Sequence, residues 1–239
     1  MRKTTLKTAG IWFAAFLVFT LIVMFVGVAP AGHPIDADTT VGLAFINVPF
    51  FEFFYNLLGD SACVAFYQTT QVCGLIAMAV VFCMALSGLS QLLKRKSFHF
   101  VDPKIYAMGF FYIIVGAFYL LFTKLAINYR PLYINNAELE ASYPSSHTML
   151  ALTVVIALIK FADDFAAEEK KAQVLYRVVT RIFIVITILF RLLSCVHWLT
   201  DIIGAVLLSI AIICLYDPLC AKCTEVHDKI EAKRIEKQK

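Results

Sequence analysis

The chain has 239 residues, of which 61% are hydrophobic and 16% are charged, and its mean hydropathy is +0.80. A soluble domain is close to half apolar and about a quarter charged, so this composition excludes an ordinary soluble protein. The net charge of +4 is not gathered into the basic patch that a nucleic-acid partner requires. We therefore expect an integral membrane protein that is surrounded by lipid and binds no nucleic acid.

Six apolar segments come close to the length of about 20 residues that a helix needs to cross a bilayer. They cover approximately residues 9–30, 64–91, 105–127, 147–162, 179–195 and 198–216. The first is longer than the apolar part of a signal peptide, so we expect it to be retained. The predicted fold class is all-α, an integral membrane six-helix bundle over residues 1–221, with a polar C-terminal tail over 222–239.

The positions of the basic residues predict the orientation of this bundle. All but three of the 21 Lys and Arg residues lie in the N-terminal tail, in the C-terminal tail, or in the connections after the second and fourth spans and the span ends that adjoin them. With six spans these segments share one side, which the positive-inside rule identifies as cytoplasmic. The sequence thus predicts a multi-pass protein of the cell membrane with both termini in the cytoplasm.

The three exceptions are Lys124, Arg130 and Arg191, which lie near the outer ends of spans. Ionisable residues at such depth usually mark a functional site, although long basic side chains also extend to the interface without further function. The segment 31–63, on the same side, begins polar and becomes aromatic. We expect it to lie in the outer interface, either covering a lipid entry or forming a packed cap.

His197 and Asp201 are four residues apart where the fifth span leads into the sixth. On a helix this spacing places both on one face, one turn apart. The carboxylate then accepts a hydrogen bond from one ring nitrogen and leaves the other free to attack. Pairing also explains a carboxylate near an apolar span, where an unpaired one would be costly.

Pro144, Ser145, Ser146 and His147 open the fourth span. A helix N-terminus binds anions through its free N–H groups and its dipole, and either serine is a suitable N-cap. His147 would lie in the first turn, where it could donate a proton to a group leaving a bound anion. Nearby Arg and Lys side chains supply the positive charge that phosphoryl transfer needs.

Metal sites are weaker alternatives. A zinc site from His147, His197 and Asp201 is conceivable, but nearby cations disfavour it. Cys220 and Cys223 form a single CxxC pair without the further ligands that zinc requires. We therefore predict no metal and no cofactor.

These clusters resemble the signature of the type-2 phosphatidic acid phosphatase superfamily. In that family a lysine is followed by six residues and Arg-Pro, then by Pro-Ser-Gly-His, then by Ser-Arg, five residues, His, three residues and Asp. The resemblance implies that His197 is the nucleophile that becomes phosphohistidine, that Asp201 orients it, and that His147 is the general acid. It also implies a set of phosphate ligands, which are Arg130, Arg191, Ser145, the backbone at Ser146, and Lys124.

Three positions depart from the family pattern. Only five residues separate Lys124 from Arg130, so Thr123 occupies the lysine position and Lys124 is rotated by about a third of a turn. Lys124 would reach the phosphate only if the helix end adjusts. Ser146 replaces the glycine, and Phe190 replaces the serine before Arg191.

The resemblance implies a metal-independent phosphatase acting on a membrane lipid phosphate, and the orientation predicted from the basic residues places its site at the extracytoplasmic boundary. Bacterial relatives hydrolyse undecaprenyl pyrophosphate, phosphatidylglycerol phosphate or phosphatidate. An outward-facing site favours undecaprenyl pyrophosphate and cell-wall synthesis. The alternatives are a lipid phosphotransferase on the same site, and a transporter or scaffold without turnover, since transporters also use intramembrane charge.

Overall fold

The computed structural model describes residues 5–31, 39–132, 140–165 and 170–238. Several sequence predictions fall outside these described residues. They concern the basic residues Arg2, Lys3 and Lys239, and the polar start of the outer segment at 32–38.

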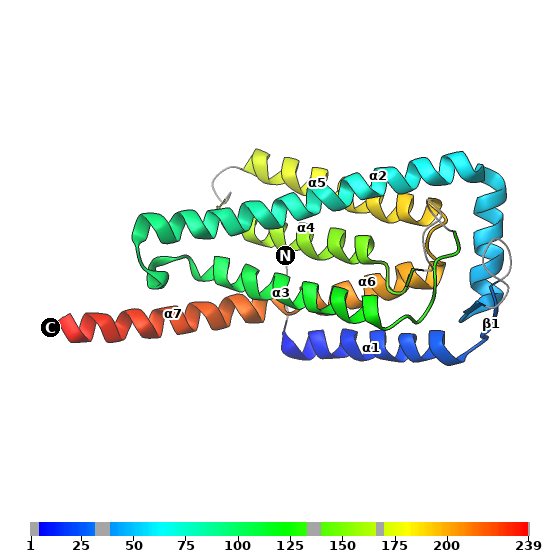
Figure 1. Cartoon of the computed structure of the whole chain (residues 1–239). Helices are drawn as coiled ribbons and strands as arrows, with labels where there is room; N and C mark the ends of the chain where they lie inside the picture. The colour runs from blue at the N-terminus through cyan, green and yellow to red at the C-terminus, as the bar shows by residue number, and fades with distance from the viewer. Residues whose placement is uncertain (1–4, 32–38, 133–139, 166–169, 239) are drawn as a thin grey trace.

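Helices build almost all of the described chain, which confirms the all-α prediction (Figure 1). The two short strands, β1 (Ala29–Pro30) and β2 (Thr40–Val41), form an antiparallel pair. The helices are α1 (Leu6–Phe25), α2 (Ala44–Arg95), η1 (Phe98–Phe100, a 3₁₀ turn), α3 (Pro103–Lys124), α4 (Ser146–Phe165), α5 (Lys170–Leu193), α6 (Leu199–Ile213) and α7 (Tyr216–Gln238).

Local chemistry explains several helix ends. The hydroxyl of Thr5 accepts from the backbone N–H of Thr8 at the start of α1. Asp102 accepts from the N–H of Lys104 at the start of α3, where proline occupies the first turn. Proline is well suited to that position because its missing N–H would have no helical partner there.

The helix α2 is bent at Gly59, whose φ of 72° lies in the region that favours glycine. The part before Gly59 crosses one end of the bundle, and the part after it runs along the bundle (Figure 1). The aromatic half of the predicted outer segment is therefore a helix that lies across the ends of the other helices.

The bundle is organised around α6, which packs against α1 on one side and α4 on the other. Its buried side chains include Leu208 and Ile212, and these contact a core that also contains Phe16, Phe111 and Met149. The start of α6 is thereby held rigidly at the end of the bundle that α2 crosses.

Large apolar side chains cover the outer faces of the helices, as a bilayer requires. Leu75, Ile113 and Leu175 are 70%, 68% and 66% exposed. In the part of the chain that the structure describes, five helical stretches are long and apolar enough to cross a membrane, namely α1, α2, α3, α5, and α6 with its continuation into α7. The apolar part of α4, Ser146–Ala162, is shorter. The protein is thus a multi-pass membrane protein, and the predicted fourth span is shorter than this length over its described residues.

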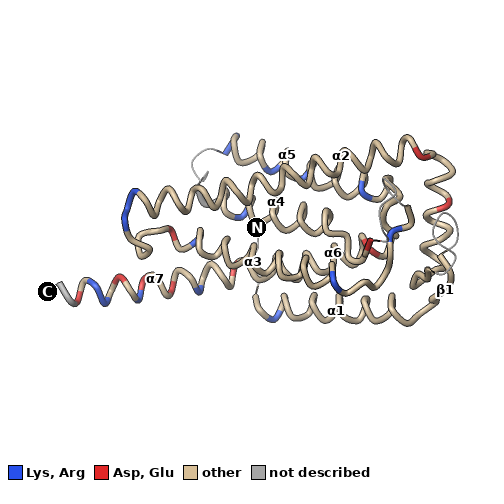
Figure 2. The backbone as a smooth tube through the Cα atoms, in the orientation of Figure 1, with Lys and Arg blue, Asp and Glu red and all other residues tan. Residues whose placement is uncertain are grey.

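The positions of the charged residues along the backbone distinguish the two ends of the described bundle (Figure 2). Basic residues of the connections and of α7 gather toward the end from which α7 projects. A few isolated charges lie within the opposite part, where α2 crosses the bundle. The described part of the predicted tail, residues 222–238, belongs to α7, which contacts α3 and η1.

Candidate active site

His197 and Asp201 meet at the start of α6. The Nδ1 atom of His197 lies 3.2 Å from Oδ2 of Asp201, and both side chains are almost completely buried. The prediction that both residues lie on one helix is wrong for His197, because α6 begins at Leu199. The pair forms instead because Asp201 reaches back over the helix start, where its Oδ2 also accepts from the N–H of Trp198 at 3.0 Å.

The other ring nitrogen of His197, Nε2, has no hydrogen-bond partner among the described residues. Burial is the largest cause that lowers the pKa of His197 well below its usual value, followed by the positive charges of Arg191 and Arg130. The ring is therefore neutral, with Nδ1 held by a carboxylate and Nε2 available. This is the form that a nucleophilic imidazole requires.

Arg191 is fully buried in the last turn of α5. Its Nη1 donates to Oγ1 of Thr70 on α2 at 3.0 Å, and its guanidinium lies 5.3 Å from the centre of the Tyr67 ring. Its Nε and Nη2 have no partner among the described residues. A buried cation with two open donors is suited to a bidentate anion such as phosphate.

Arg130 lies in the coil after α3 and forms an ion pair of 2.7 Å with Glu140. Both residues line a polar cavity of about 320 Å³, which His197 and Ser146 also line. The Nε atom of Arg130 has no partner among the described residues. The polar cavity is thus lined by the candidate nucleophile His197, by the cation of Arg130 and by the start of α4.

Ser145 directly precedes α4 and is fully buried. Its N–H donates to the backbone oxygen of Asp201 at 3.1 Å, which ties the start of α4 to the start of α6. Ser146 is the first residue of α4, and it lines both the polar cavity and a second, apolar cavity. The expected serine positions therefore lie at a helix start beside the polar cavity.

His147 lies on the first turn of α4 and lines the apolar cavity. His147 also interacts electrostatically with His197, as do the two arginines, so the four groups lie close enough to act on one another. Its Nδ1 has no partner among the described residues. A Cβ atom on Gly74 would come within 2.9 Å of the His147 ring, so α2 passes directly behind this imidazole.

Lys124 ends α3 and is exposed, and it is not one of the residues that line the described polar cavity. Thr123 lines that cavity instead. The structure therefore shows the rotation that the shortened spacing predicts, and the helix end has not adjusted to bring Lys124 inward.

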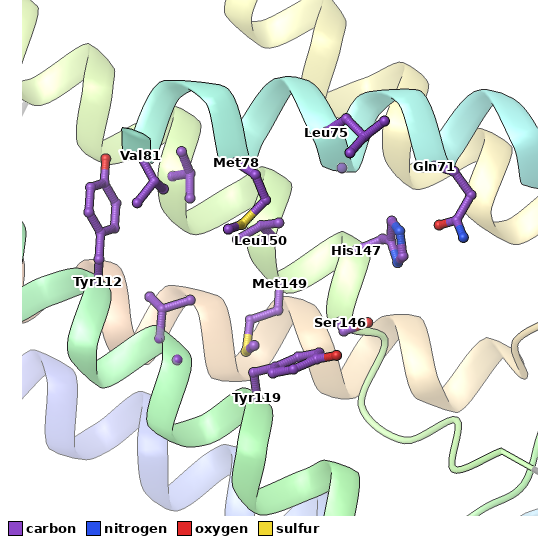
Figure 3. A pocket seen from close by; sticks show the side chains of 14 residues that line it. Gln71, Leu75, Met78, Val81, Tyr112, Tyr119, Ser146, His147, Met149 and Leu150 are labelled. Atoms are coloured by element: carbon purple, nitrogen blue, oxygen red, sulfur yellow. The ribbon is translucent and has the colours of Figure 1, made fainter. Parts of the chain in front are cut away.

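The apolar cavity lies between α2, α3 and α4 and has a volume of about 670 Å³ (Figure 3). It extends from His147 and Gln71 at one end, past Met78 and Met149, to Tyr112 at the other. An elongated apolar cavity beside a polar one is suited to an amphiphile whose charged group and chain occupy different compartments.

Three residues around the site carried no signal in the sequence. Glu140 pairs with Arg130, Thr70 binds Arg191, and Asn128 donates to Oδ1 of Asp201 at 3.2 Å. Within the described residues, no group of three or more His, Cys, Asp or Glu side chains is placed to hold a metal ion.

Comparisons with known proteins relate this arrangement to a family. The model of the PAP2 superfamily matches residues 76–221. This range includes all of the positions, from Lys124 to Asp201, that resemble the family pattern. No curated protein sequence matches the chain significantly.

Two crystal structures resemble the fold. One is a transmembrane PAP2-type phosphatidylglycerolphosphate phosphatase from Bacillus subtilis, with a TM-score of 0.61 and 16% identity, covering 90% of this chain and 96% of that one. The other is Aquifex aeolicus LpxE, with a TM-score of 0.42 and 18% identity, covering 74% and 94%. Since the family model spans more than half of the sequence and carries the site, the chain belongs to the PAP2 superfamily of phosphatases.

Proposed function

We propose that this chain removes phosphate from a membrane lipid through a covalent intermediate on His197, without a metal ion. One observation carries the proposal: Asp201 holds the His197 ring at Nδ1, Nε2 has no partner within the described part of the chain, and the ring lines the polar cavity. An imidazole held in this way is an activated nucleophile.

In the proposed reaction, Nε2 of His197 attacks the terminal phosphorus, and the bond from that phosphorus to the leaving oxygen breaks. The leaving oxygen is the bridging oxygen of a pyrophosphate or the alcohol oxygen of a lipid monophosphate. His147 protonates the departing oxygen. Water then attacks the phosphohistidine, with His147 acting as the base, and phosphate is released. The arginines and the start of α4 stabilise the charge on the phosphoryl oxygens, which is the main requirement of such transfers.

The apolar cavity supports a lipid substrate. It begins at His147 and shares Ser146 with the polar cavity, so a phosphate in the polar cavity would place its chain between α2, α3 and α4 (Figure 3).

The charge distribution supports an extracytoplasmic site. If the basic end of the bundle is cytoplasmic, the polar cavity opens at the outer boundary, where it would meet lipids of the outer leaflet. We therefore propose undecaprenyl pyrophosphate as the first substrate to test, followed by phosphatidylglycerol phosphate and phosphatidate.

The test is a phosphate-release assay with each of these lipids, in EDTA, on wild type and His197→Ala. We expect release by wild type, none by His197→Ala, and inhibition by vanadate, which resembles pentacoordinate phosphorus. Full activity of His197→Ala, or dependence on an added divalent metal, would contradict the mechanism. Release from phosphatidate but not from the polyprenyl pyrophosphate would overturn only the proposed substrate order. Loss of released phosphate when a second lipid acceptor is added would indicate a phosphotransferase.

A further inference from the structure

Asn128 connects four segments that surround the site. It lies in the coil after α3 and is 1% exposed. Its Nδ2 donates to Oδ1 of Asp201 at 3.2 Å, and its Oδ1 accepts from the N–H of Gly42 at 3.4 Å. Its backbone oxygen accepts from the N–H of Ser142 at 2.8 Å. The coil after α3, the coil that leads to Pro144 and Ser145, the start of α6 and the segment before α2 therefore meet at Asn128.

The bond from Asn128 complements the two bonds on the other oxygen of Asp201. Oδ2 accepts from His197 and from the N–H of Trp198, whereas Oδ1 accepts from Asn128. Asp201 is fully buried, and a buried acceptor without a donor costs about 1–3 kcal/mol. Fixing Oδ1 fixes the plane of the carboxylate, and hence the direction in which Oδ2 faces the imidazole.

The chemistry of an amide suits this position. Asn128 must donate to a carboxylate and accept from a backbone N–H, and an amide provides both groups at once. The reverse orientation of the amide would place its oxygen against the carboxylate of Asp201 and its NH₂ against the N–H of Gly42. Hydrogen bonding therefore selects one orientation.

Gly42 is itself held in place. A Cβ atom at this position would lie 1.6 Å from the backbone oxygen of Val23, so the close approach to α1 requires glycine. Asn47, in the crossing part of α2, donates to the oxygen of Gly42 and to Oγ1 of Thr200, both at 2.8 Å. Its Oδ1 accepts from the N–H of Thr200. Through Asn47, the crossing part of α2 thus holds Gly42, which donates to Asn128, and Thr200, which precedes Asp201.

We infer that Asn128 is a positioning residue for the reaction, which orients Asp201 so that the carboxylate holds His197 in its attacking form. This inference rests on the proposed function, since it assigns Asn128 a role through the His197–Asp201 pair. Residues 42 and 47 lie before the region matched by the family model, which begins at residue 76. The hydrogen bonds that support the His197–Asp201 pair therefore come partly from residues outside the part of the chain that the family model matches.

The experiment compares Asn128→Ala with Ser209→Ala in the full chain, using phosphate release from a lipid phosphate. Ser209 is a matched control because it is fully buried on α6 and donates only within its own helix, to the oxygen of Ala205. We expect Asn128→Ala to lower kcat about 10- to 100-fold, as loss of a supporting hydrogen bond does at comparable sites, with KM within about twofold. Ser209→Ala should remain within about twofold of wild type in both constants.

A double-mutant cycle separates positioning from a purely structural role. In an Asp201→Ala background, measured by single turnover at high enzyme concentration, Asn128→Ala should cause no further loss, because both changes act on one unit. Equal losses in both backgrounds, or an effect of Asn128→Ala no larger than that of Ser209→Ala, would overturn the inference. If Asn128→Ala does not fold, Asn128→Ser is put through the same cycle.

The same measurements distinguish this inference from the proposed function. If wild type releases no phosphate, or His197→Ala is as active as wild type, the proposed function fails. If His197→Ala is inactive and Asn128→Ala has the kcat of wild type, only the role of Asn128 fails.

Discussion

Oε2 of Glu140 lies 2.7 Å from Nη2 of Arg130 at the edge of the polar cavity. The carboxylate is paired with the guanidinium that we propose as a phosphate ligand, and the side chain of Glu140 is 51% exposed while that of Arg130 is 16% exposed. An incoming phosphoryl group therefore has to displace Glu140 or share Arg130 with it.

Removing the charge of Glu140 should strengthen anion binding. Because a partly exposed ion pair contributes at most about 1 kcal/mol, we expect Glu140→Gln to lower the inhibition constant of vanadate by about two- to fivefold. The measurement is the inhibition constant of vanadate at low salt. The control variant is Glu225→Gln, because Glu225 forms an exposed ion pair with Lys222 on α7, away from the site. Weaker vanadate binding by Glu140→Gln would show that Glu140 positions Arg130 and does not compete for it.

Thr70 should affect catalytic efficiency by holding the guanidinium of Arg191. Changing Thr70 to Val removes the oxygen that accepts from Nη1 of this buried guanidinium, and an unpartnered buried donor costs about 1–3 kcal/mol. We expect kcat/KM to fall about tenfold. Thr187→Val is the control, because Thr187 is also buried on α5 but its hydroxyl donates to Phe183 within the helix. Equal activity of the two variants would contradict a role for Thr70.

Gly74 leaves space for the ring of His147. In Gly74→Ala the new Cβ would approach Cδ2 of His147 to 2.9 Å and Nε2 to 3.1 Å, so the imidazole has to move. A displacement of about 1 Å at a reacting group can cost a factor of about 100 in rate; we expect a fall in kcat of about tenfold or more. Gly109→Ala on α3, where nothing lies within 4 Å, should keep the wild-type rate. A Gly74→Ala enzyme with wild-type kcat would argue against His147 as the acid.

The pH dependence should report the neutral form of His197. Burial and the charges of Arg191 and Arg130 lower its pKa, so the ring stays deprotonated, and kcat/KM is retained, as the pH falls below the usual histidine value of about 6.5. Removing a positive charge eases protonation and raises this pKa. The acid limb of kcat/KM should therefore move to higher pH in Arg130→Gln. Wild type and Arg130→Gln are compared with the same substrate, so that ionisation of the substrate affects both profiles equally. A shift of the acid limb to lower pH in Arg130→Gln would contradict the assignment of this limb to His197.

Local spacing predicted much of the site. The interval of four residues between His197 and Asp201 brought the two side chains together, although the contact is made across a helix start and not along a helix. The rotation of Lys124 also followed from helix periodicity. Such features depend on a few consecutive residues, whose geometry the chain itself fixes.

The supporting partners could not be predicted in this way, because they are distant in sequence. Asn128 and Asp201 are 73 positions apart, and Thr70 and Arg191 are 121 positions apart. The sequence around a buried amide or hydroxyl contains no periodic pattern from which its hydrogen-bond partner could be predicted. Only the packing of α2 and of the coil after α3 against the bundle shows which functional group each one holds.

The most direct test of the account is to trap the phosphorylated enzyme. Wild type is mixed with a lipid phosphate carrying radiolabelled phosphorus, quenched within a turnover and digested for mass spectrometry, beside His197→Ala. The account predicts a label on the peptide containing His197, stable in alkali and lost in acid as expected of phosphohistidine, and no label on the variant. Label on another residue, or an equally labelled His197→Ala enzyme, would contradict it.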